Sequence, residues 1–115
     1  MKDYNGELQY KDKIYKLIFN LNVMEAIQEE YGSLDEWSKL TDGVSGEPNA
    51  KAIIFGFMAM INEGIDIENE ENGTDVKQLT LKQVGRIVTE VGLQEATSQL
   101  NETVVESTKS EEKNE

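Results

Sequence analysis

Cysteine and histidine are both missing from this sequence of 115 residues. Without cysteine the chain has no disulfide framework, no thiolate nucleophile and no thiolate metal site. Without histidine it lacks the commonest general base and the commonest metal ligand. A pair of carboxylates is the remaining catalytic design, but one of them would need a pKa raised in an enclosed cleft. Since the acidic residues fall on expected helix surfaces or in an acidic loop, we expect no enzyme activity, catalytic residues, metal site or cofactor.

Positive charge is scarce, with 11 Lys and Arg residues against 23 Asp and Glu residues. The formal net charge is −12 and the isoelectric point is about 4.4. DNA, RNA and anionic membranes attract clusters of Lys and Arg, and the sequence shows no basic cluster. The composition therefore argues against sequence-independent binding to nucleic acid or to anionic lipid. Solubility alone is sufficient to explain the acidity.

Long hydrophobic runs are also missing. The first six residues lack the apolar run of a secretory signal, and no stretch approaches the length that spans a bilayer. We therefore expect a cytoplasmic protein with no membrane partner. Hydrophobic residues make up 37% of the chain, which is enough for one core. We expect a single domain over residues 1–106 and a disordered acidic tail over 107–115.

The first element is a β-hairpin, because residues 7–10 and 14–19 flank a polar turn at 11–13. The alternation of a strand places one set on the core face, namely Tyr15, Leu17, Phe19 and Leu21. A two-stranded ribbon is marginal in water, so helices must cover it, while an unpaired edge can pair with another chain. The residues expected at this self-association edge are Leu8, Tyr10, Ile14 and Ile18. A homo-oligomer is the assembly that such pairing predicts.

Capping signals predict two short helices after the hairpin. Asn22 is placed to cap the first helix, with Glu25 at the position that completes a capping box. This helix should end at Tyr31, before Gly32. Ser33 and Glu36 repeat the start signal, and the second helix carries Leu34, Trp37 and Leu40 on one side. Trp37 is more typical of a core anchor than of an exposed recognition residue.

The third helix should begin at Asn49 and close at Gly64, after a loop over residues 41–48. Its interior, residues 50–61, is apolar around almost the whole circumference. Such a helix is either enclosed in the core or offers part of its surface to a partner. Both interpretations remain open from the sequence. The candidate partner-binding residues are Ile54, Phe55, Met58, Met60 and Ile61.

Residues 66–75 are acidic, show no apolar period and predict a mobile loop. The segment is not a calcium loop, since Glu71 stands where the required glycine would be. Thr80 with Gln83 forms a capping box for a fourth helix that ends at Gly92, and Leu79 can staple onto it. Its apolar stripe comprises Leu81, Val84, Ile87, Val88 and Val91. A fifth helix, from Leu93, carries Ala96, Leu100 and Val104.

The predicted fold is therefore α+β, mostly α, with an N-terminal β-hairpin followed by four to five short helices. Its order of motifs runs from residues 17–22 at the end of the hairpin through 27–33 and the apolar helix to 79–85. In this order the chain resembles the tail assembly chaperones of long-tailed phages and prophages, a group that is also similar to a component of gene transfer agents. The likeness covers roughly residues 7–105.

The resemblance implies a protein that binds the long, aggregation-prone tape measure protein, keeps it soluble and assists assembly of the tail tube. The tail tube protein is a second candidate partner. The resemblance transfers no catalytic residues. Two alternatives come from other classes: an acidic mimic of DNA that inhibits a nucleic-acid-binding enzyme, and a minor structural protein of the tail.

Overall fold

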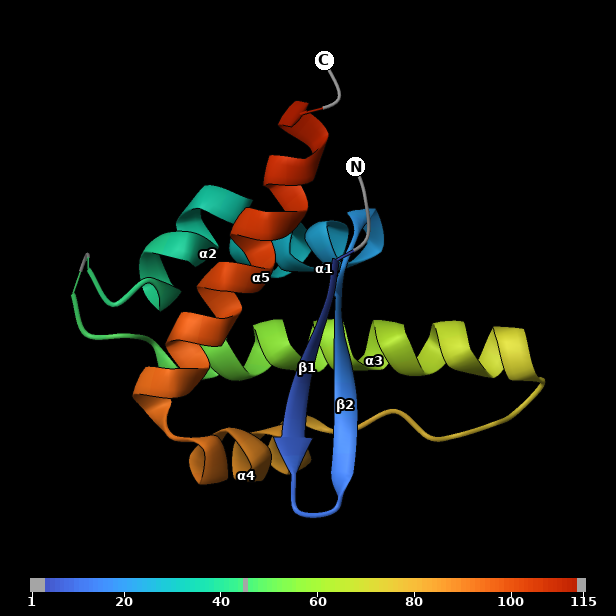
Figure 1. Ribbon diagram of the computed structural model, residues 1–115. Helices are drawn as coiled ribbons and strands as arrows, with labels where there is room; N and C mark the ends of the chain where they lie inside the picture. The colour runs from blue at the N-terminus through green and yellow to red at the C-terminus, as the bar shows by residue number, and fades with distance from the viewer. Residues whose placement is uncertain (1–3, 45, 114–115) are drawn as a thin grey trace.

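A computed structural model describes the backbone of residues 4–44 and 46–113 and the side chains of residues 6–44 and 46–106. Two strands come first and helices follow, so the expected α+β, mostly α fold is confirmed (Figure 1). The elements in chain order are β1 (Tyr4–Tyr10), β2 (Lys13–Phe19), α1 (Leu21–Tyr31), α2 (Leu34–Thr41), α3 (Ala50–Asn72), α4 (Leu81–Val91) and α5 (Leu93–Lys113). None of the described helices has both the length and the apolarity needed to cross a membrane.

β1 and β2 form an antiparallel hairpin in which Leu8 lies opposite Tyr15 and Gly6 lies opposite Leu17. Leu8, Leu17 and Phe19 share one face of the hairpin and are buried, and Ile18 on the opposite face is buried as well, so both faces of β2 are covered near its end. Leu21, which the sequence assigns to the face of Leu17 and Phe19, is 66% exposed. That assignment is wrong because the chain turns into α1 at this residue and the strand alternation ends.

The N-cap of α1 is Asn20 and not Asn22. The Asn20 side chain accepts a hydrogen bond from the backbone N–H of Val23 at 3.2 Å. Asn22 lies in the first turn, and its side-chain amide donates to Glu63 on α3 at 3.1 Å. The cap is thus two residues earlier than predicted. The end of α1 before Gly32 and the Ser33 cap of α2 are confirmed.

α3 begins after Asn49, as predicted, but it does not close at Gly64. The helix continues to Asn72 and ends at Gly73, which has a φ of 66°. The predicted loop over 66–75 is therefore helical as far as residue 72. Gly64 is buried against β2, where a Cβ would lie 3.2 Å from the Lys16 carbonyl oxygen. The glycine permits close packing of helix on strand, which from sequence alone looks the same as a helix stop.

The capping box of α4 is present, with reciprocal hydrogen bonds between Thr80 and Gln83. α4 ends before Gly92, as predicted. Leu81 does not join the buried stripe of this helix and is 40% exposed. The backbone of α5 is helical as far as Lys113, whereas the sequence predicts a domain limit at residue 106 and a disordered tail beyond it. The side chains after 106 and residues 114–115 lie outside the described part.

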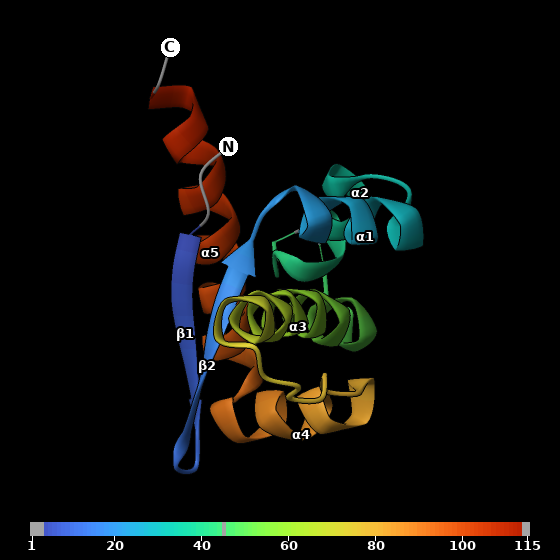
Figure 2. The same ribbon diagram turned by 90° about the vertical axis from the view of Figure 1, so that its right-hand side faces the viewer.

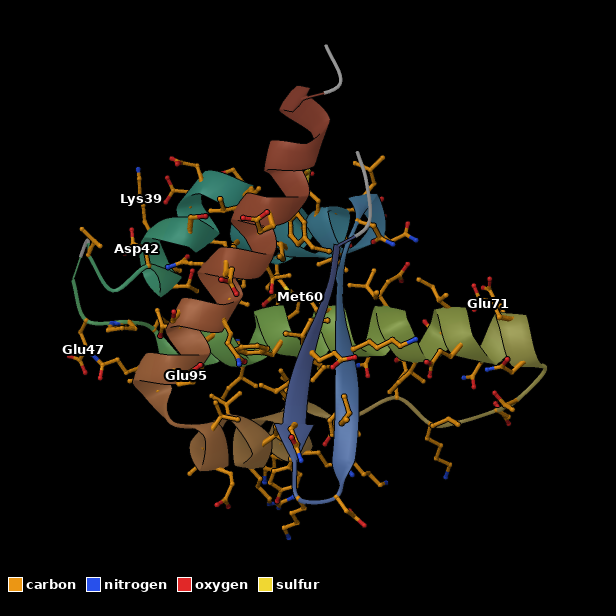
Figure 3. The ribbon with its side chains drawn as sticks, in the orientation of Figure 1. Lys39, Asp42, Glu47, Met60, Glu71 and Glu95 are labelled. Carbon is orange, nitrogen blue, oxygen red and sulfur yellow. The ribbon has the colours of Figure 1, made fainter. Side chains whose placement is uncertain are left out.

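α3 lies at the centre of the molecule. α1 and α2 pack on one side of it and α4 on the opposite side, while the hairpin and α5 cover a third side (Figures 1 and 2). The acidic end of α3 extends away from this packing, and Glu71 lies near its tip (Figure 3). Met60 lies near the crossing of α3 with the hairpin and is fully buried there. The core therefore forms around the apolar middle of α3.

Candidate functional site

The structure divides the five candidate partner-binding residues of α3. Met60 and Ile61 are 0% and 1% exposed, so their assignment to a partner-binding surface is wrong for this structure. They lie on the helix face of Ile53 and Phe57, which packs into the core at the spacing of successive turns. Ile54, Phe55 and Met58 are half-buried and remain candidates. The apolar helix is thus partly core and partly surface.

The half-buried residues do not form one continuous surface. Phe55 packs edge-on against the ring of Tyr31 on α1, with ring centroids 5.6 Å apart and an interplanar angle of 73°. The Tyr31 hydroxyl is buried without a hydrogen-bond partner among the described atoms. Burial, together with the nearby charge of Glu30, raises the pKa of Tyr31 above its ordinary value of 10.0. Phe55 therefore belongs to the contact between α1 and α3.

Ile54 faces the other way, toward α4, and lines an apolar groove of about 280 Å³. The residues lining this α3–α4 groove are Ala50, Ile53, Ile54, Gly85, Val88, Thr89 and Leu93. The floor includes Gly85, where a Cβ would be 3.4 Å from Ile54 Cδ1. At the end where α4 gives way to α5, the Leu93 side chain is 50% exposed. A second, more polar hollow of about 520 Å³ also includes Leu93, so the two depressions adjoin there.

Asn62 fixes the position of α4 relative to α3. Its side-chain amide donates to the Leu79 carbonyl oxygen at 3.0 Å, and its side-chain oxygen accepts from the Leu79 N–H at 2.8 Å. Leu79 immediately precedes the capping box at Thr80. The segment that starts α4 is therefore held to α3 by two hydrogen bonds from one side chain.

Positive charge gathers along α4. Residues 76–89 contain Lys77, Lys82 and Arg86 and no acidic residue. All three side chains are exposed, and none forms a salt bridge with a described residue. On the α3 side, Lys51 is 4.0 Å from Glu30, at the limit of an ion pair. The sequence analysis overlooked this basic segment because it is a small part of a strongly acidic chain.

The opposite charge gathers at the far end of α3. Glu63, Asp66, Glu68, Glu70 and Glu71 all lie on its second half. Glu68 pairs with Lys16 of β2 at 3.0 Å, and this hydrogen bond and charge raise the pKa of Lys16 above 10.5. In the described residues no group of three carboxylates is arranged to hold a metal ion.

The hairpin residues proposed for self-association are only partly at the surface. Leu8 and Ile18 are buried, so they cannot offer side chains to a second copy, and their assignment to a contact surface is wrong. Leu8 faces the core, and Ile18 packs against Gly64. Tyr10 is half-buried, and Ile14 is 61% exposed near the turn. Self-association remains a prediction that depends on the backbone edge and these two side chains.

β1 carries the edge of the hairpin that has no third strand in the described part of the chain. Tyr10 and Lys13 close a two-residue turn, so the N–H and C=O groups of Glu7 and Gln9 point away from β2. The corresponding edge of β2 lies against α3 at Gly64. Backbone pairing with another chain is therefore open to β1 only.

Sequence reasoning identified Ile54 but missed the α4 side of the groove. Its one signal was Gly85, a glycine within a predicted helix, which indicates a close approach by a neighbouring group. Leu93 gave no signal, because its exposure depends on the packing of α5. Compared with protein-family models, curated proteins and solved structures, the chain matches none.

Proposed function

We propose that this protein is a phage tail assembly chaperone that holds a helical segment of a tape measure protein in the α3–α4 groove. It acts in the cytoplasm of the bacterial host, keeps the client soluble and assists assembly of the tail tube around it. Its role is binding, without a catalytic step. The resemblance of the sequence motifs supports the family, and the α3–α4 groove supports the mode of binding.

The observation that carries the proposal is the half-buried side chain of Ile54 in an open apolar groove. Ile54 packs over Gly85, and Leu93 stands half-exposed at one end. Leaving a large apolar side chain fully in water forgoes about 1.5 to 3 kcal/mol, so a client that covers the exposed parts of Ile54 and Leu93 gains a fraction of this energy for each. A net charge of −12 keeps such a complex soluble.

Co-expression with the tape measure protein of the same phage genome tests the proposal. We expect the tape measure protein to stay in the soluble fraction with the wild-type chain and to aggregate without it. The double variant Ile54→Glu with Leu93→Glu should lose this effect, because carboxylates would line the groove. Leu21→Glu with Val76→Glu is the matched control, since both side chains are exposed and neither lines the groove. Circular dichroism checks that all variants are folded.

Two results would contradict the proposal. One is a tape measure protein whose solubility is the same with and without this chain. The other is recovery of the chain from purified phage particles at a fixed stoichiometry, because a chaperone leaves the finished tail. That second result would identify a structural tail protein instead.

One observation favours a second candidate, an acidic mimic of DNA. Mimicry requires carboxylates in rows on rigid elements, and a mobile acidic loop would not provide them. Residues 66–72 are helical, so Asp66, Glu70 and Glu71 lie on a rigid helix that extends from the body (Figures 1 and 3). Binding to a DNA-processing enzyme that collapses with added salt, without an effect on tape measure solubility, would favour mimicry.

A further inference from the structure

We infer that the segment held in the α3–α4 groove is an amphipathic helix whose apolar stripe is bordered by acidic residues. This inference rests on the proposed function, because it describes the chemistry of the client at the same groove. Three observations support it: the shape of the groove, the hydrogen bonding of its walls and the charge on its rim.

The walls of the groove favour a helix over an extended strand. Both walls are helices, so the backbone N–H and C=O groups of the interior lining residues Ile54 and Gly85 are already paired within α3 and α4. The Thr89 hydroxyl in the lining donates to the Gly85 carbonyl oxygen at 2.8 Å and is also occupied. An extended segment would leave its own backbone groups unpaired there, whereas a helix satisfies them internally. Apolar side chains at helical spacing then supply the contacts.

The rim of the groove on the α4 side is cationic. Lys82 lies three residues before Gly85 and seven before Thr89, so it lies on the same helix face as these two lining residues. Arg86 lies three residues before Thr89, at the solvent side of that face. Both side chains are exposed and without a salt bridge to a described residue.

Unpaired cations are notable in this protein because acidic residues outnumber basic ones by 23 to 11. Lys16 pairs with Glu68 and Lys39 pairs with Asp35. Lys11, Lys13 and Lys77 form no salt bridge with a described residue, as is the case for Lys82 and Arg86 on α4. The cations of α4 remain available for carboxylates from another molecule. Lys51 on α3 does not add to this rim, because its ammonium group lies 4.0 Å from Glu30 of α1. Charge complementarity therefore selects a client with acidic flanks.

The net charge of the whole molecule predicts the opposite preference, for a client with basic flanks. At −12 the protein should attract basic peptides and repel acidic ones at long range. At physiological salt, charges separated by more than about 8 Å are largely screened, so contacts at the rim dominate the affinity of a docked helix. The two predictions have opposite signs, which makes the inference decidable with simple probes.

The probes are two fluorescent helical peptides with the same Leu stripe at i, i+4 and i+7. One carries Glu beside the stripe, and the other carries Lys at the same positions. We expect the wild-type chain to bind the Glu peptide about tenfold more tightly, by fluorescence anisotropy, as two exposed charge pairs allow. The difference should shrink in high salt. Equal binding, or tighter binding of the Lys peptide, would overturn the inference.

Charge reversal on the rim supplies the second arm. Lys82→Glu with Arg86→Glu should reverse the preference, so that the Lys peptide binds better. The single variants Lys82→Glu and Arg86→Glu are also measured, each with Lys39→Glu as its control. Lys39→Glu makes the same change in net charge on α2, across α3 from α4 (Figure 2). A control effect as large as that of Lys82→Glu would show that net charge acts and not the rim, and would also overturn the inference.

The two proposals fail separately. If the tape measure protein stays soluble with both wild type and the double charge variant, and the peptides bind equally, the inference fails while the function stands. If the Glu peptide is preferred but the tape measure protein still aggregates, the inference stands while the function fails.

Discussion

The indole ring of Trp37 on α2 occupies the space beside Gly56 on α3. A Cβ added at residue 56 would lie 2.5 Å from Trp37 Cζ2. Trp37 is fully buried, and its Nε1 donates to the Ala52 carbonyl oxygen at 2.9 Å, so the ring cannot move aside easily. The clash should cost about 1 to 3 kcal/mol and the gain in helix propensity is about 1 kcal/mol, so Gly56→Ala should lower the free energy of unfolding by up to about 2 kcal/mol. Urea unfolding followed by circular dichroism measures this.

Gly85→Ala is the matched comparison, since Gly85 is also a glycine inside a helix. A Cβ there would be 3.4 Å from Ile54 Cδ1, an ordinary contact with the end of a flexible side chain. Helix propensity should then prevail, and the free energy of unfolding should rise by about 0.5 to 1 kcal/mol. If both variants shift stability in the same direction, the packing of Trp37 on Gly56 does not have the role assigned to it.

Substitution of Met60 is expected to affect stability, whereas substitution of Met58 is expected to affect client binding. Met60 is fully buried, so Met60→Ala should cost about 2 to 5 kcal/mol of stability. Met58 is half-buried and lies one turn after Ile54, so Met58→Glu should leave a folded protein that binds the tape measure protein less well. Thermal unfolding and a pull-down with the tape measure protein measure the two effects. A folded Met58→Glu variant with full binding would remove Met58 from the binding surface.

Sequence reasoning succeeded where the signal is local. Ser33 and Thr80 were assigned correctly as caps, because a cap is recognised from residues within one turn. The start of α3 at Asn49 was placed correctly to within one residue. Gly92 was a correct stop for the same reason. The α+β order followed from the change in apolar period after the hairpin.

The failures share a different cause, which is contact between distant parts of the chain. Gly64 reads as a helix stop, but its role is to let α3 approach Lys16 of β2. Composition predicts a loop after residue 65, but α3 continues there. Two contacts with other segments accompany this part of the helix: the ion pair of Glu68 with Lys16, and the hydrogen bonds of the Asn69 side chain with the Val76 backbone. The α3–α4 groove joins segments more than twenty residues apart. Ile54 could be predicted from the apolar pattern of a single helix. The exposure of Leu93 could not, because it depends on how α5 packs after α4.

Asn62 should be important for the groove without touching a client. Asn62→Leu removes both hydrogen bonds to Leu79 and leaves a backbone N–H and C=O in a partly buried place. We expect a loss of about 2 to 3 kcal/mol in the free energy of unfolding and weaker client binding, because α4 is no longer held at its distance from α3. Asn69→Leu is the control, since the Asn69 side chain makes similar hydrogen bonds to the Val76 backbone but at an exposed place, and it should cost less. Equal losses in the two variants would contradict this role of Asn62.

Tyr31 gives a prediction with a defined dependence on pH. Its hydroxyl is buried without a partner among the described atoms, so Tyr31→Phe should raise the free energy of unfolding by about 1 kcal/mol at pH 7 while keeping the ring contact with Phe55. Burial, then the charge of Glu30, raises the pKa of this phenol in the folded state above 10.0. Below pH 10 the phenol is neutral in both states. Above it the unfolded chain loses the proton first, so wild-type stability falls as pH rises.

The variant lacks this phenol, so the stability difference between Tyr31→Phe and wild type should widen between pH 9 and pH 11. Lys16 also has a raised pKa, through its hydrogen bond and charge interaction with Glu68, and its stabilising contribution is likewise lost above pH 10.5. That loss occurs equally in both proteins and cancels in the comparison, as do the contributions of the other tyrosines. Urea unfolding at pH 7, 9, 10 and 11 measures the difference. A difference that stays constant across this range would contradict both the burial of the Tyr31 hydroxyl and the influence of Glu30, because each of them raises the pKa of the phenol in the folded state.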